Sequence, residues 1–154
     1  MRLAQILQLD GVKVLGAATS KKRLFHDLGF MAQDCFDLGQ TDVVEALLER
    51  EALGPTGVGH GVALPHARLS GITTVRGLFV RLEKPLDFDS VDRQPVDLVF
   101  ALFAPAAAGA EHLKALALVA RTMRDGDICA KLRANSESDT LHSILTEEHT
   151  SQAA

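Results

Sequence analysis

One stretch of the chain is apolar almost without a break: Val96-Asp97-Leu98-Val99-Phe100-Ala101-Leu102-Phe103. It lacks the apolar–polar alternation of a strand with one solvated face, so we expect a strand that is covered on both faces. A second strand is expected over Thr74 to Leu82, which is rich in Thr, Val, Leu and Phe, and Glu83 to Pro95 is expected to be the polar loop between the two. A doubly covered strand among several helices predicts a layered α/β domain.

Two helices are expected before these strands. The first begins after Ser20, a residue type that caps helix N-termini, and its apolar residues recur at helical spacing: Leu24, Phe25, Leu28, Met31, Ala32, Cys35 and Phe36. Lys21-Lys22-Arg23, the only basic run, falls in its first turn and is interpreted as solvated. The second helix is expected to begin at a capping box of Asp42 and Glu45 and to end at Gly54-Pro55.

Three further helices are expected after the strands. The longest, Ala110 to Arg124, is expected to bury an apolar stripe that consists of Leu113, Leu116, Ala117 and Ala120. Two shorter ones are expected over Asp127 to Ala134 and Ser138 to Glu147. We expect Thr150 to Ala154 to be a frayed tail, which leaves residues 1–149 as one domain.

The composition is that of an ordinary globular protein. Of the 154 residues 47% are hydrophobic, and the formal net charge of -4 gives no electrostatic reason to expect nucleic acid as a partner. Cys35 and Cys129 form no metal or redox motif, so both are expected to be buried thiols in a reducing compartment. The best apolar run, Leu98 to Ala108, is too short to span a bilayer, and no apolar signal segment follows the N-terminus. These features predict a cytoplasmic protein without direct membrane insertion.

The clearest candidate site is the segment Gly57-Val58-Gly59-His60-Gly61-Val62-Ala63-Leu64-Pro65-His66-Ala67-Arg68. Its alternating glycines permit unusual backbone conformations and close approach of a ligand, and Pro65 fixes the backbone just before His66. An imidazole in such a place is suited to accept a phosphoryl group. By residue type alone, His66 is also open to the roles of general base, metal ligand or hydrogen-bonded structural residue.

Two other residues are candidates to support His66. His112 is expected in the first turn of the helix after the buried strand, where free backbone N–H groups favour an anion, although a local hydrogen bond there is an equally good interpretation. Arg50 is expected near the end of the second helix, and its planar guanidinium suits phosphate, although a surface ion pair with a nearby glutamate is the common alternative. Helical spacing places Glu51 toward the apolar face, where it either orients a site group or follows the end of the helix.

The remaining candidates flank the centre of the segment. We expect the phosphoryl group or a docking partner to contact Gly59, His60, Gly61 and Arg68, unless these residues are merely solvated, as is common in exposed loops.

Metal chemistry is a weaker alternative. His60, His66 and His112 fit a three-histidine zinc site on paper, but their spacings match no helix-borne motif and a nearby arginine would repel a cation. The acidic residues of the polar loop lack the glycine and the distal glutamate of a calcium loop, so they are interpreted as a solvated turn: Asp87, Asp89 and Asp92. We therefore expect no metal and rank a zinc hydrolase well below phosphotransfer.

Several motifs occur in order along the chain: Glu49-Arg50-Glu51, Gly54-Pro55-Thr56 with the segment up to His66, Pro85-Leu86-Asp87-Phe88-Asp89, Gln94-Pro95-Val96-Asp97-Leu98-Val99-Phe100-Ala101-Leu102 and Glu111-His112-Leu113. Together they resemble the fructose/mannitol-type enzyme IIA domain of the bacterial phosphotransferase system, over nearly the whole chain. As a free-standing domain with the N-terminal stretch Leu15 to Arg23, the chain is most similar to the nitrogen-regulatory branch of that family.

This resemblance implies a fold, a site and partners. The fold would be a single layered α/β domain with a mixed β-sheet flanked by helices on both sides. His66 would be the phosphoryl acceptor, with Arg50 and His112 at the two supporting positions, and no cofactor would be needed. The donor would be an HPr-like carrier of the NPr type, itself charged from phosphoenolpyruvate by an enzyme I. The phosphorylation state would control regulatory targets such as a potassium transporter, a sensor kinase or proteins of nitrogen metabolism.

The chain departs from the family pattern at two positions that bear on the site. Pro55 stands where serine is common and has no N–H to offer, and His60 replaces an asparagine with a titratable ring. These departures keep open the alternative of a degenerate, non-phosphorylated binding module. A soluble IIA component of a fructose/mannitol-type sugar transporter is a further alternative.

Overall fold

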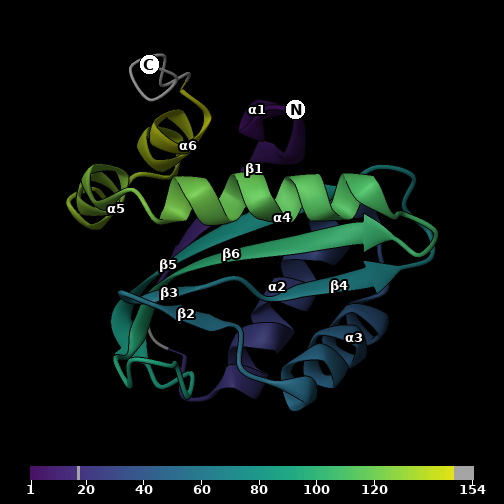
Figure 1. Cartoon of the computed structure of the whole chain (residues 1–154), viewed down its shortest axis with the longest axis horizontal. Helices are drawn as coiled ribbons and strands as arrows, with labels where there is room; N and C mark the ends of the chain where they lie inside the picture. Colours follow the sequence, from purple (N-terminus) through teal and green to yellow (C-terminus); the bar gives the residue numbers. More distant parts are fainter. Residues whose placement is uncertain (17, 148–154) are drawn as a thin grey trace.

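A six-stranded mixed β-sheet forms the middle layer of the protein (Figure 1). The structure is a computed structural model and describes residues 1–16 and 18–147, so the tail expected at Thr150 to Ala154 lies outside the described residues. The strands are β1 (Leu7–Leu15), β2 (Gly57–Gly59), β3 (Val62–Ala63), β4 (His66–Leu69), β5 (Arg76–Leu86) and β6 (Val96–Pro105). The helices are α1 (Leu3–Ile6), α2 (Lys21–Phe36), α3 (Gln40–Leu53), α4 (Ala110–Met123), α5 (Gly126–Arg133) and α6 (Ser138–Thr146).

The sheet is built around β6. On one side β5 runs antiparallel to β6 and pairs in turn with β1, which is parallel to β5. On the other side two short strands share β6 in succession. β3 pairs in parallel with it at Leu98 and Val99, and β4 does so from Leu102 onward, while β2 pairs antiparallel with β3. The edge of β6 is thus divided between β3 and β4.

The sheet separates two apolar cores, which confirms the expected α/β fold with helices on both faces. α2 and α3 cover one face, where Phe25 and Val43 are fully buried. α1, α4, α5 and α6 cover the other face, where Phe79 and Val119 are fully buried (Figure 1). The residues from 98 to 104 of β6 are all buried, as its uninterrupted apolar sequence predicts.

The predicted helices are largely confirmed. Ser20 caps α2, because its hydroxyl oxygen accepts a hydrogen bond of 3.1 Å from the backbone N–H of Arg23. α4, α5 and α6 begin and end within a residue of the expected positions. The interpretation of the basic run as solvated is wrong for Lys21, whose ammonium group lies 2.9 Å from the Glu51 carboxylate.

Three other details differ from the sequence-based expectation. α3 begins at Gln40 after Gly39, so Asp42 falls in its first turn and forms no capping box. β5 extends to Leu86, which pairs with Val96, so the polar loop is shorter than expected. α4 buries a different face, because the fully buried Ala115 lies on its core side while Leu113 is 66% exposed.

The two cysteines differ in their burial. Cys129 is buried as expected, but Cys35 is only half-buried; both thiols are free, and burial raises the pKa of each. Within residues 1–16 and 18–147, every helix is too short or too polar to cross a bilayer.

Removal of a β6 side chain should test the central position of this strand. Leu98 is fully buried, so Leu98→Ala is expected to lower the free energy of unfolding by about 2–5 kcal/mol through lost burial and a residual cavity. The matched change Leu53→Ala, at a side chain 84% exposed, is expected to cost no more than about 0.5 kcal/mol. Urea unfolding curves measure both values, and equal losses would contradict this role of β6.

Candidate functional site

His66 begins β4 at the junction where the neighbour of β6 changes from β3 to β4. The carbonyl of Pro65 accepts a hydrogen bond of 2.9 Å from the N–H of Leu102, and His66 lies opposite Leu102 in the parallel register. Because Pro65 is buried and its backbone is paired, the position of the His66 backbone is fixed by the sheet. The His66 side chain is half-buried.

The two ring nitrogens of His66 have different partners. Nδ1 lies 2.9 Å from the carbonyl oxygen of Leu64, which can only accept a hydrogen bond, so Nδ1 carries the proton. Arg50 Nε donates to Nε2 over 3.2 Å, which requires a lone pair on Nε2. The neutral ring is thereby held in one tautomer, with Nε2 as its nucleophilic atom.

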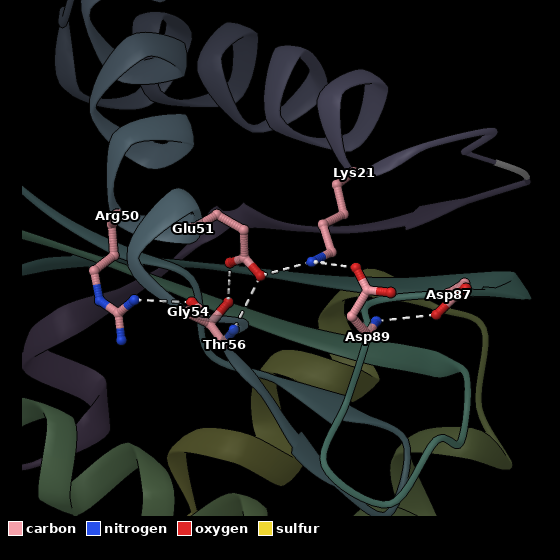
Figure 2. A network of polar contacts seen from close by, with 7 residues as sticks. All are labelled: Lys21, Arg50, Glu51, Gly54, Thr56, Asp87 and Asp89. Atoms are coloured by element: carbon pink, nitrogen blue, oxygen red, sulfur yellow. Dashed lines mark hydrogen bonds and ion pairs between the residues drawn. The ribbon is translucent and has the colours of Figure 1, made fainter.

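Arg50 reaches His66 from the last turn of α3. Its Nη1 donates a hydrogen bond of 2.9 Å to the carbonyl of Gly54, just beyond the end of the helix (Figure 2). These two contacts place the planar guanidinium beside Nε2, where it can bind oxygens of a phosphoryl group. The alternative interpretation, a surface ion pair with a neighbouring glutamate, is wrong for the residues that the structure describes.

His112 approaches His66 from the opposite layer. It lies in the first turn of α4 and is 6% exposed, and its ring centroid is 5.6 Å from that of His66 in an edge-to-face arrangement. Within the described part of the chain, neither buried ring nitrogen has a hydrogen-bond partner. Burial lowers the pKa of His112 below its ordinary value of about 6.5, and the proximity of His66 and Arg68 acts in the same direction. The ring is therefore neutral near pH 7, and its N–H is available to an anion.

These side chains surround one pocket of about 440 Å³ between α3, β4 and α4. Arg68 lines it together with Arg50, His66 and His112. Its apolar lining includes Leu53, Leu113 and Leu116, so two leucines of the predicted core stripe of α4 face this pocket. The helical spacing of these two leucines predicts an apolar face of the helix, but it does not indicate that this face lines a functional site.

Gly59 and His60 line a different pocket, between the β2–β3 hairpin and the α4–α5 corner. The Arg133 guanidinium, which forms an ion pair with Asp97, donates to the carbonyl of His60 over 2.8 Å. Gly61 makes room for this pair, because a Cβ there would lie 2.5 Å from Arg133 Nη2. The structure thus places Arg68 in the pocket with His66, whereas Gly59 and His60 line a different pocket. The group that lies close to Gly61 is a side chain of the protein itself and not a ligand.

His60, His66 and His112 do not form the three-histidine zinc site, because His60 lines a different pocket from the other two. Nowhere in residues 1–16 and 18–147 do three His, Cys, Asp or Glu side chains gather so that they can hold a metal ion. In the acidic loop, Asp92 accepts hydrogen bonds from the backbone N–H groups of His60 and Gln94, which lower its pKa. Asp87 likewise accepts from the N–H of Asp89, so these carboxylates shape the loop.

One group that shapes the site cannot be predicted from the sequence. The carbonyl of Leu64 fixes the tautomer of His66, and a backbone group of this kind is not encoded by residue type. As a whole, the pocket offers a nucleophilic nitrogen, an arginine and a neutral histidine around one small space, which suits the binding and transfer of a phosphoryl group.

Comparison with known proteins adds an independent result. The family described as phosphoenolpyruvate-dependent sugar phosphotransferase system, EIIA 2, matches residues 5–148. A nitrogen regulatory protein of Bradyrhizobium diazoefficiens is 50% identical over 126 residues, which cover 82% of this chain and 82% of that protein. The nitrogen regulatory protein of Escherichia coli K12 is 39% identical over 148 residues, 96% of this chain and 91% of that protein. The crystal structure of nitrogen regulatory protein IIA-Ntr from Neisseria meningitidis aligns with a TM-score of 0.86 and 39% identity over 94% of this chain and 99% of that chain.

The lowered pKa of His112 predicts a dependence of stability on pH. Below about pH 6.5 the unfolded chain takes up a proton at His112 that the folded chain resists, so the free energy of unfolding should decline as the pH falls from about 7 to about 5. His112→Gln is expected to decline less over this range. Urea unfolding at several pH values measures the difference, and an NMR titration that puts the pKa of His112 at or above its ordinary value would contradict the argument.

Proposed function

This chain belongs to the phosphoenolpyruvate-dependent sugar phosphotransferase system EIIA 2 family, and we propose that it is a nitrogen-regulatory phosphocarrier. In this proposal, Nε2 of His66 accepts a phosphoryl group from an HPr-like carrier of the NPr type. The phosphorylation state then regulates target proteins of potassium transport or nitrogen metabolism, such as a transporter or a sensor kinase. The names of the similar proteins support regulation as the output rather than sugar uptake.

The observation that carries this proposal is the pair of hydrogen bonds that directs the Nε2 lone pair into the pocket. During transfer, the lone pair forms the new N–P bond while the N–P bond of the donor phosphohistidine breaks, and the electrons of the broken bond remain on the donor nitrogen. The proton on Nδ1 stays in its hydrogen bond to Leu64. No further reactant is required, because one N–P bond replaces another.

Arg50 and His112 are suited to stabilise the phosphoryl group in the transition state of the transfer. The transition state spreads charge over three equatorial phosphoryl oxygens, and a neighbouring guanidinium and a neutral N–H donor compensate this charge. Arg50 contacts Nε2 in the resting state, so it must move from the nitrogen to the phosphoryl oxygens when the new bond forms. Its flexible side chain allows this while the His66 backbone remains in the sheet.

The surroundings of the pocket support a protein as the donor. Leu53 and Leu113 are 84% and 66% exposed, and they lie on the two helices that flank His66. Exposed apolar side chains next to a reactive group are typical of docking surfaces. A small-molecule donor would not need them.

Neither departure from the family pattern lines the pocket around His66. His60 lines the second pocket, and Pro55 is exposed in the turn where the neighbouring Thr56 is the residue that donates hydrogen bonds. Neither departure removes a partner of His66. This geometry favours an active phosphocarrier over the degenerate binding module.

A phosphorylation assay tests the proposal. With phosphoenolpyruvate, enzyme I and the cognate carrier, the chain is expected to gain one acid-labile phosphoryl group, linked to Nε2 of His66. His66→Ala should abolish the labelling, while His26→Gln, a change at a histidine of α2, should leave it intact. Mass spectrometry and phosphorus NMR measure the label, and persistent labelling of His66→Ala or an unlabelled wild type would refute the assignment.

A further inference from the structure

Glu51 has an unusual position for a carboxylate beside a pocket. Its side chain is 8% exposed, and it lies at the end of α3 next to Arg50. Oε2 accepts hydrogen bonds from Lys21 Nζ at 2.9 Å and from the backbone N–H of Thr56 at 3.0 Å, and Oε1 accepts from the Thr56 hydroxyl (Figure 2). A nearly buried carboxylate with three donors rigidly joins the groups that it binds.

The contacts of Thr56 continue to the reacting histidine. The carbonyl of Thr56 accepts a hydrogen bond of 3.0 Å from the N–H of Leu64, and the carbonyl of Leu64 accepts the Nδ1 proton of His66. A single path of hydrogen bonds therefore runs from the carboxylate of Glu51 to the imidazole. Any shift of Thr56 moves the carbonyl that selects the His66 tautomer.

The second partner of His66 depends on the same turn. Arg50 donates from Nη1 to Gly54, and the N–H of Gly54 donates to the carbonyl of Glu51 over 3.2 Å. The turn from Gly54 to Thr56 is thus held at one end by Arg50 and at the other by Glu51 (Figure 2). The two hydrogen-bond partners of the His66 ring, Arg50 and the Leu64 carbonyl, are thus both anchored to this turn.

Lys21 supplies the compensating charge. A buried carboxylate is costly unless a cation and hydrogen bonds accompany it, and the Lys21 ammonium, on a side chain 20% exposed, comes from the first turn of α2. This ammonium also lies 5.1 Å from the centroid of the Phe88 ring. Its second carboxylate partner, Asp89, is 3.4 Å away and 77% exposed, so it contributes little.

We propose that Glu51 is a positioning residue for phosphoryl transfer at His66, acting through Thr56 and Leu64 and held in place by Lys21. The proposal rests on the function proposed above. It assigns Glu51 no contact with the phosphoryl group, only the alignment of the two groups that direct Nε2.

Two substitutions test the path at successive points. Glu51→Gln keeps the shape but loses the charge and one acceptor oxygen, and Thr56→Val removes the hydroxyl donor while it keeps the backbone N–H. Misalignment of the nucleophile is expected to lower the transfer rate at saturating donor roughly 10- to 100-fold for Glu51→Gln, and less for Thr56→Val. The donor concentration at half-maximal rate should change by less than about twofold, because the docking surface is unaltered. Thr56→Ser, which retains the hydroxyl, should restore the rate.

A spectroscopic readout separates positioning from stability. Nitrogen-15 NMR of the imidazole near neutral pH should show the wild-type His66 with its proton on Nδ1, and a mixture of tautomers in Glu51→Gln. This measurement needs no phosphoryl donor. If the wild type accepts no phosphoryl group, the proposed function is refuted. The role of Glu51 as a positioning residue is then decided by the His66 tautomer of Glu51→Gln compared with that of the wild type.

Asp89→Asn is the matched control, since it removes an exposed carboxylate from the same lysine. It should leave both the rate and the tautomer unchanged. If Glu51→Gln does not fold, Thr56→Val decides. A variant that loses thermal stability but keeps the wild-type rate and the single Nδ1–H tautomer shows a purely structural role and overturns the proposal.

Discussion

The pairing of β4 with β6 is the interaction on which the site depends. β6 is buried on both faces, so its backbone groups must find partners along both edges. The hydrogen bond between Leu102 and Pro65 pins the start of β4 in register and leaves His66 at a fixed point of the sheet. Because β3 ends just before this point, the imidazole lies at the junction between two short strands and lines the pocket.

The pocket joins two layers that otherwise do not share a core. Arg50 comes from α3, which packs on one face of the sheet, and His112 comes from α4 on the other face. Side chains from both helices line the pocket that contains His66. The constellation is therefore complete only when both layers have docked on the sheet, which links the geometry of the site to the integrity of the whole domain.

The sequence predicts the regular elements better than the edge of the sheet. The capped helix after Ser20 and the doubly buried strand have strong local signals, and motifs and residue chemistry predict His66, Arg50 and His112 as the site residues. The strands β2, β3 and β4 have two to four residues each and are held by pairing with distant segments, so local periodicity does not reveal them. α4 has apolar residues on two stripes, and only packing decides that Ala115 is buried while Leu113 faces the pocket. The sequence predicts that Gly61 contacts a phosphoryl group or a docking partner, but Gly61 accommodates Arg133, which is far away in the sequence and which local patterns do not connect with it.

The two unpaired ring nitrogens of His112 have a consequence for energetics. Within the described residues they are buried and unsatisfied, so the resting protein carries a desolvation cost there. In the proposed phosphorylated form, an oxygen of the phosphoryl group would relieve part of this cost, and the phosphohistidine would lie lower in free energy than an exposed one. A phosphoryl group that His112 contacts in this way would be held more strongly than one fully exposed to solvent.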